Sequence, residues 1–276
     1  MLELIKYDGY THEKELLEIL TTYAENAIAE CVNLFSVDDK RNGRDLVTTT
    51  DKRIEQYCTS LISRQFPYDE IIAEETYNSK TDIETGKRYW IIDPLDGTWN
   101  YANHIPLFAF QIAFVDNMIP VLSVISIPYG INGKERFYAQ KGIGAFCNGV
   151  KLGESKRSDI RKTVIALGDL SLWNTESVYS ELDFVKKTRP FVGLYRIFGS
   201  SAISFAYLAA SRVDAYISFF QKPWDVVPGM LIAEECGCTA YQLDGYPFRI
   251  GLPDFVMINK TDGLHKIVFP DLSHRH

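Results

Sequence analysis

The chain has 276 residues, 46% of them hydrophobic and 24% charged, which is enough for one large domain or two closely packed halves. This composition excludes a disordered protein, and a net charge of −7 without a Lys/Arg stripe argues against a nucleic-acid polymer as partner. No apolar run reaches membrane-spanning length, so we expect no membrane partner.

Five cysteines are spread along the chain without any C-x-x-C pair, at Cys31, Cys58, Cys147, Cys236 and Cys238. An odd number at these spacings favours neither a disulfide framework nor a zinc site, and indicates reduced, mostly buried thiols. The first twenty residues carry acids early and lack the continuous apolar segment of a secretion signal. We therefore expect a cytoplasmic protein.

Two helices are expected near the start of the chain. Apolar residues recur at helical spacing between residues 12 and 35, which predicts a long amphipathic helix. The run Thr48-Thr49-Thr50 ahead of Asp51 supplies a second helix start, and that helix should end at Pro67.

Short apolar runs then indicate a change to strands. A hairpin is expected from residues 109–115 and 121–127, with its turn at 116–117. Other strands are expected at 71–73, 89–92, 137–140, 145–147, 164–167 and 213–218, and further helices at 200–211 and 224–236. This mixture predicts layered sheets covered by helices, of the α/β or α+β class, which the order alone does not separate.

Acidic residues gather where apolar runs end. Glu74 and Glu75 follow one run, Asp93 and Asp96 follow the next, and Asp225 stands in a third segment, Pro-Trp-Asp-Val-Val-Pro-Gly. Strand ends are where sheet proteins present binding groups. Oxygen ligands without His or Cys select Mg²⁺ or Mn²⁺ rather than zinc, so these acids are candidate metal ligands.

The block D-P-L-D-G-T, residues 93–98, is the strongest signal. We expect Asp93 to leave the strand, Pro94 to fix a bend, and Asp96 to turn back toward the same point. Gly97 gives the backbone freedom to approach a ligand, and Thr98 opens a helix or turn whose free N–H groups can bind a phosphate oxygen.

Simpler interpretations exist for each acid taken alone. Any of them can be a cap or turn residue, Glu74 and Glu75 can form a solvated surface pair, and Asp51 and Asp225 can be acids at helix starts. Phosphatases of the haloacid dehalogenase type carry a related D-x-D-G-T block with a covalent aspartate nucleophile. Here two residues separate the aspartates instead of one, which disfavours that class.

The chain resembles the inositol monophosphatase superfamily of lithium-sensitive, Mg²⁺-dependent phosphatases. The resemblance rests on D-L-V-T-T-T-D (45–51), I-A-E-E-T (72–76), W-I-I-D-P-L-D-G-T-W-N (90–100), G-I-G-A-F-C-N-G (142–149) and W-D-V-V-P-G (224–229). It implies a layered αβαβα sandwich, usually a homodimer, with two or three Mg²⁺ ions. We expect one catalytic unit over 1–276, with a metal-site half at 1–155 and a substrate half at 156–276.

The resemblance also implies roles for individual residues. The metal ligands would be Glu74, Asp93, Asp96, Asp225 and the carbonyl of Leu95. Asp51 and Thr98 would position the attacking water, and with Glu74 they form the implied catalytic set. The implied substrate contacts are Gly97, Thr98, Asp169, Gly199, Ser200, Ser201 and Ser218.

Ser218 departs from the pattern. In inositol-cleaving members an acid stands seven residues before the Trp-Asp aspartate and helps to hold sugar hydroxyls, and here Ser218 takes that place. The expected substrate is a small soluble phosphate ester such as inositol monophosphate or another sugar phosphate. Fructose bisphosphate, a 3′-phosphonucleotide and a non-catalytic metal- and phosphate-binding role stay open as alternatives.

Overall fold

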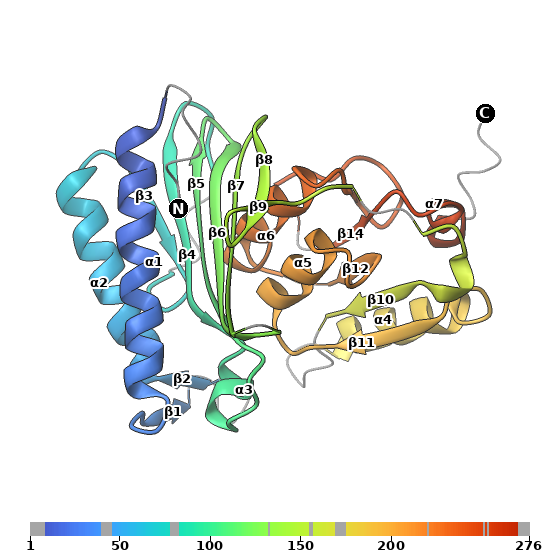
Figure 1. The fold of residues 1–276 in the computed structure, drawn as a ribbon, viewed down its shortest axis with the longest axis horizontal. Helices are drawn as coiled ribbons and strands as arrows, with labels where there is room; N and C mark the ends of the chain where they lie inside the picture. Colours follow the sequence, from blue (N-terminus) through green and yellow to red (C-terminus); the bar gives the residue numbers. More distant parts are fainter. Residues whose placement is uncertain are drawn as a thin grey trace.

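The computed structural model describes residues 9–39, 46–77, 83–131, 133–154, 157–168, 175–219, 221–250, 252 and 254–269, with the backbone only at 39 and 175–177. Five layers follow one another: a helix pair, a seven-stranded sheet, a second helix pair, a five-stranded sheet and an outer helical layer (Figure 1). The predicted αβαβα sandwich is confirmed.

The first layer consists of α1 (Thr11–Cys31) and α2 (Thr49–Gln65). The apolar stripe of α1 buries Leu16, Leu20 and Ile28 against the sheet, as its periodicity predicts. Helix α2 begins with a capping box in which Thr48 and Asp51 exchange hydrogen bonds. Two short strands, β1 (Val37–Asp39) and β2 (Leu46–Thr48), pair antiparallel between these helices.

The seven-stranded sheet has the order β3-β4-β5-β6-β7-β8-β9, with β3 and β4 parallel and the other pairs antiparallel. Its strands are β3 (Glu70–Ala73), β4 (Arg88–Asp96), β5 (Ala109–Asp116), β6 (Ile119–Gly130), β7 (Gly133–Gln140), β8 (Gly144–Cys147) and β9 (Val150–Lys151). The expected hairpin is confirmed: Asn117 and Met118 both have positive φ, as its tight turn requires.

Helices α5 (Ser201–Ala209) and α6 (Pro223–Glu234) fill the space between the two sheets. One apolar cluster joins them to both sheets, with Phe137 from the first sheet and Met257 from the second. The helices approach closely because Gly229 has no side chain: a Cβ there would collide with the Phe205 ring. The glycine of W-D-V-V-P-G is therefore a packing residue.

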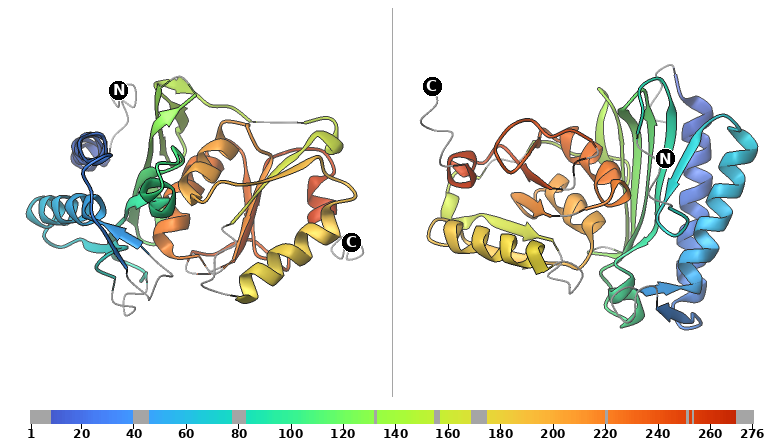
Figure 2. Two further views of the ribbon diagram at one scale, coloured as in Figure 1. Left: turned by 90° about the horizontal axis from the view of Figure 1, so that it is seen from below. Right: turned by 180° about the vertical axis from the view of Figure 1, so that it is seen from behind.

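The five-stranded sheet has the order β11-β10-β12-β14-β13. Its strands are β10 (Val164–Leu167), β11 (Leu194–Ile197), β12 (Ala215–Ser218), β13 (Thr239–Tyr241) and β14 (Phe255–Ile258). Strands β11, β10 and β12 run parallel, and β14 and β13 are antiparallel additions. Helices α4 (Thr175–Thr188) and α7 (Leu264–Val268) cover its outer face, opposite α5 and α6 (Figure 2).

One expectation about the chain path is wrong. Strand β4 does not end before Asp93 but continues to Asp96. Asp93 pairs with Gln111 and Asp96 with Ala109, so β4 holds one more residue than β5 between these pairs, which makes a β-bulge. Pro94 has no N–H to donate and fits at such a bulge. No described helix is long and apolar enough to cross a membrane.

Candidate active site

The acids singled out in the sequence meet where three elements end or begin. Glu74 follows β3, Asp93 and Asp96 lie on the bulged end of β4, and Asp225 lies in the first turn of α6. Strands β3 and β4 are parallel neighbours, so their carboxyl ends share one edge of the sheet. Asp225 does not follow a strand directly; α6, from the middle layer, brings it to this edge.

Three carboxylates form a tight cluster. One oxygen from each of Asp93, Asp96 and Asp225 lies within 4.8 Å of the others. Asp93 and Asp96 are buried and Asp225 is partly buried. The extra residue of the bulge re-aims the β4 backbone, which is how two aspartates three residues apart face one point.

The cluster is electrostatically unfavourable without a cation. Burial, followed by repulsion from Glu74, Asp96 and Asp225, raises the pKa of Asp93 well above its usual range. Burial and repulsion from Asp96 and Glu74 do the same for the pKa of Asp225. Burial raises the pKa of Asp96 to about 6 although hydrogen bonds to Ser200 and Ala202 oppose the shift. Repulsion from Glu74 contributes to the raised pKa of all three aspartates, but Glu74 lies outside the 4.8 Å cluster.

The donor set fits a hard divalent cation. It offers carboxylate oxygens from Asp93, Asp96 and Asp225, and the repulsion among them is relieved by a bound cation. Carboxylate oxygens without imidazole or thiolate suit Mg²⁺ and Mn²⁺.

Each aspartate is held in place by the chain around it. Oδ2 of Asp96 accepts hydrogen bonds from the Ser200 hydroxyl and from the Ala202 N–H at 2.6 Å. Oδ1 of Asp93 accepts from the Leu95 N–H at 3.0 Å, and Oδ2 of Asp225 accepts from the Lys222 N–H at 2.9 Å. Asp225 is therefore a helix cap as well as a member of the cluster.

Asp51 and Thr98 lie beside this cluster and contact each other. The Thr98 hydroxyl is 3.2 Å from Oδ1 of Asp51 and 3.0 Å from the carbonyl oxygen of Leu95. The other Asp51 oxygen accepts from the Thr48 N–H at 2.9 Å. Asp51 is fully buried. One carboxylate oxygen of Asp51 therefore caps the helix start, while the other accepts a hydrogen bond from Thr98.

Gly97 and Gly199 make a close backbone contact next to the aspartates. Gly97 has φ +89°, and a Cβ there would lie 2.8 Å from the Leu107 carbonyl oxygen and 3.2 Å from that of Gly199. The Asn100 amide donates to the carbonyls of Leu107 and Phe198 at 2.7 and 2.8 Å. Gly199 has φ +66°, and a Cβ there would lie 2.9 Å from the Asn100 amide nitrogen, so the fold requires glycine at both positions.

The remaining implied substrate residues are placed as follows. The Ser200 hydroxyl is engaged by Asp96, and the Ser201 hydroxyl donates to Gln221 at 3.1 Å. Ser218 is fully buried at the end of β12. Asp169 lies outside the described residues.

Two groups at the site were missed from sequence. The Gln111 amide donates a hydrogen bond to Oδ2 of Asp93 at 3.4 Å. The Asn100 amide holds the segment before α5 by its hydrogen bond to the Phe198 carbonyl. Asn100 ends the longest motif, W-I-I-D-P-L-D-G-T-W-N, which was a usable signal. Gln111 stands within an otherwise apolar stretch of β5, and the structure buries it. A glutamine in such a stretch indicates that its side chain has a polar partner in the core, which here is Asp93.

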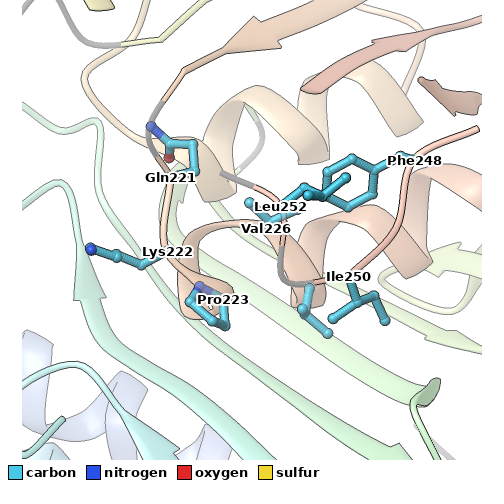
Figure 3. A pocket seen from close by; sticks show the side chains of 8 residues that line it. Gln221, Lys222, Pro223, Val226, Phe248, Ile250 and Leu252 are labelled. Carbon is cyan, nitrogen blue, oxygen red and sulfur yellow. The ribbon is translucent and has the colours of Figure 1, made fainter. Parts of the chain in front are cut away.

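A small, mostly apolar pocket adjoins the start of α6. Its lining includes Lys222, Val226, Phe248 and Ile250 (Figure 3). The Lys222 side chain points away from the Phe248 ring. The backbone N–H and the charge of Lys222 both oppose the rise of the Asp225 pKa.

Comparison with known proteins agrees with this geometry. A family model described as the inositol monophosphatase family matches residues 10–272. The chain is 31% identical to an inositol-1-monophosphatase of Bacillus subtilis, over 87% of this chain and 88% of the relative. It is 30% identical to a fructose-1,6-bisphosphatase/inositol-1-monophosphatase of Thermotoga maritima, over 81% and 82%.

Solved structures give the same result. An IMPase/NADP phosphatase complexed with Mg²⁺ and phosphate superposes with a TM-score of 0.79 at 26% identity, covering 95% of both chains. The chain therefore belongs to the inositol monophosphatase family, and it is a phosphoric monoester hydrolase.

Proposed function

We propose that this enzyme is a Mg²⁺-dependent phosphatase that hydrolyses a small soluble phosphate ester, such as inositol monophosphate or another sugar phosphate. The observation that carries the proposal is the convergence of Asp93, Asp96 and Asp225 within 4.8 Å. Acids so close together, and buried, are costly unless the site binds cations.

Glu74, Asp93, Asp96, Asp225 and the Leu95 carbonyl would hold two or three ions, with Mn²⁺ as a possible substitute. When bound, such ions lower the pKa of a water and neutralise charge on the phosphate and on the leaving oxygen. The related IMPase/NADP phosphatase complexed with Mg²⁺ and phosphate supports this choice of metal.

Asp51 and Thr98 would orient the attacking water. A threonine hydroxyl that donates a hydrogen bond to a carboxylate keeps its lone pairs to accept a hydrogen bond from the attacking water, whose proton can then pass through the hydroxyl to that carboxylate. The 3.2 Å contact between Thr98 Oγ1 and Asp51 Oδ1 provides this arrangement. The water's proton then has an acceptor, and direct attack on phosphorus requires no covalent enzyme intermediate.

A phosphate-release assay with and without Mg²⁺ tests the proposal. Wild-type protein should release phosphate from inositol 1-phosphate and from phenyl phosphate when Mg²⁺ is present, and EDTA should abolish both activities. Asp96→Asn should lose about 100-fold or more in kcat/KM while it keeps the wild-type circular dichroism spectrum. Metal-independent release, or full activity of Asp96→Asn, would overturn the proposal.

A second substrate class follows from the relatives. One relative is named fructose-1,6-bisphosphatase/inositol-1-monophosphatase, and a similar structure is an IMPase/NADP phosphatase. Fructose 1,6-bisphosphate and a 3′-phosphonucleotide therefore belong in the same assay. A protein that binds Mg²⁺ and phosphate but hydrolyses no ester would be the non-catalytic relative.

We also propose that the protein is a homodimer and acts in the cytoplasm. Both statements rest on likeness to the family. Light scattering coupled to gel filtration tests the first, and cell fractionation tests the second.

A further inference from the structure

A second hydrogen bond joins the two helices that carry Asp51 and Thr98. The Thr50 hydroxyl of α2 and the Tyr101 hydroxyl of α3 (Thr98–Ala102) are 3.1 Å apart, and either can be the donor. Both side chains are fully buried. Thr50 precedes Asp51 in the first turn of α2, and Tyr101 lies about one turn after Thr98 in α3. The two contacts therefore act between the same pair of helix starts.

Aromatic packing holds the Tyr101 ring in place. Its centroid lies 4.9 Å from that of Phe108, edge to face, and 4.6 Å from that of Phe35. Helix α3 itself lies beside β2, the strand that leads into α2 (Figure 1). Burial raises the pKa of Tyr101 to about 12, so its hydroxyl keeps its proton at neutral pH. The hydroxyl is therefore a constant hydrogen-bonding partner for Thr50.

The position of Thr98 matters because its hydroxyl has one proton and two acceptors. The Leu95 carbonyl oxygen is 3.0 Å from Thr98 Oγ1, and Oδ1 of Asp51 is 3.2 Å from it. A hydroxyl donates only one hydrogen bond at a time. Leu95 is three residues before Thr98 and stays within reach if α3 moves, whereas Asp51 belongs to another helix. A small increase in the distance between α2 and α3 would therefore direct the proton to Leu95.

We propose that the hydrogen bond between Tyr101 and Thr50 holds the Thr98 hydroxyl within reach of its carboxylate partner and so sets the rate at which water attacks the phosphate ester. This inference rests on the proposed function, in which Asp51 and Thr98 orient that water. Tyr101 and Thr50 are positioning residues, because they act through this pair. Loss of their hydrogen bond should lower kcat and leave KM and cation binding unchanged, since the interaction it supports is made in the transition state.

Three variants test the inference. Tyr101→Phe removes one hydroxyl and keeps the ring packing, and Thr50→Val removes the other hydroxyl with little change in shape. Tyr138→Phe is the matched control: the Tyr138 hydroxyl is also buried, has no hydrogen-bond partner in the part of the chain that the structure describes, and lies on β7, three strands from β4. Each protein is assayed with Mg²⁺ on inositol 1-phosphate and phenyl phosphate, and Mn²⁺ binding is measured by isothermal titration calorimetry.

Tyr101→Phe should lower kcat by about fivefold on both esters, as expected for the loss of one neutral hydrogen bond, with KM and the Mn²⁺ dissociation constant unchanged. Thr50→Val should give the same loss, and the double variant should lose no more than either single variant. Thr50→Ser keeps a hydroxyl and should restore kcat relative to Thr50→Val. Tyr138→Phe should change none of these quantities.

The most decisive comparison uses Thr98→Ala, which lacks the hydroxyl that Tyr101 positions. In that background Tyr101→Phe should not lower the remaining kcat any further. General damage to the fold would lower it by the same factor as in the wild type. The comparison therefore separates positioning of Thr98 from support of the fold.

An unchanged kcat for Tyr101→Phe, or the same fold-loss with and without Thr98, would overturn the inference and leave the proposed function intact. Weaker Mn²⁺ binding by Tyr101→Phe would also overturn it, because Tyr101 would then support the acid cluster. If Tyr101→Phe does not fold, the pair Thr50→Val and Thr50→Ser makes the same test from the other helix. If the wild type hydrolyses neither ester with Mg²⁺, the proposed function fails and the inference fails with it.

Discussion

At the scale of single residues, the acids of the site oppose the stability of the metal-free fold. The pKa of Asp96 is about 6 in the folded protein against an ordinary value of 3.8. Because the folded pKa is the higher one, the contribution of Asp96 to stability is complete below about pH 4 and is lost as the pH rises through about 6.

Asp96→Asn isolates this effect, since asparagine mimics the protonated acid and can still accept from Ala202. Without metal, the melting temperature of the variant relative to wild type should rise between pH 4 and pH 7. Adding Mg²⁺ at pH 7 should stabilise the wild type and not the variant. Asp183→Asn, which removes a surface ion pair with Lys187 on α4, is the control and should show neither trend. A melting-temperature difference between Asp96→Asn and wild type that does not change with pH would contradict the argument.

At the scale of elements, the turn after β4 depends on a residue without a side chain. Gly97→Ala should lower stability by more than the about 1–2 kcal/mol expected for a left-handed alanine alone, because its Cβ meets the Leu107 carbonyl oxygen at 2.8 Å. Activity should fall as well, since Asp96 and Thr98 flank the strained position.

Gly86→Ala is the matched control for this experiment. Gly86 also has positive φ, at +79°, but a Cβ there would meet nothing within 4 Å. Chemical denaturation should therefore give a smaller loss for Gly86→Ala, with activity retained. Equal losses of stability for the two variants would show that the contact with Leu107 is unimportant.

Some helices and strands could be predicted from the sequence and others could not. Helices α1 and α2 and the β5–β6 hairpin were predictable because periodicity, caps and turn residues are local signals. The path of β4 through Asp93 was not, since a bulge is defined by the partner strand β5, far along the chain. The local block still identified the acids correctly as neighbours in space.

At the scale of the whole molecule, the sequence indicated layers but not their connections. Nothing local in α6 shows that it lies between two sheets and carries Asp225 to the end of β4. Nor did local pattern reveal that Glu181 and Ser218 both lie beside Gly168, because this depends on how α4 packs on the second sheet. Such long-range contacts are decided by packing of the complete core.

The shared core between the sheets leads us to propose that the chain unfolds as one unit. Phe205 of α5 contacts Tyr216 of β12 and Phe255 of β14, with ring centroids 4.9 and 5.3 Å apart. Phe205→Ala should cost about 3–5 kcal/mol. Calorimetry should show one transition shifted as a whole, with equal calorimetric and van't Hoff enthalpies. Two separated transitions would contradict a single unit.

The central claim is that Asp93, Asp96 and Asp225 form a cation site. Crystals grown with Mn²⁺, measured for anomalous diffraction, test it most directly, with Asp225→Asn as the control. We expect an anomalous peak within coordination distance of the three wild-type carboxylates, and a weaker or absent peak in the variant. A wild-type map without a peak there, or with these side chains pointing to separate parts of the molecule, would contradict the account.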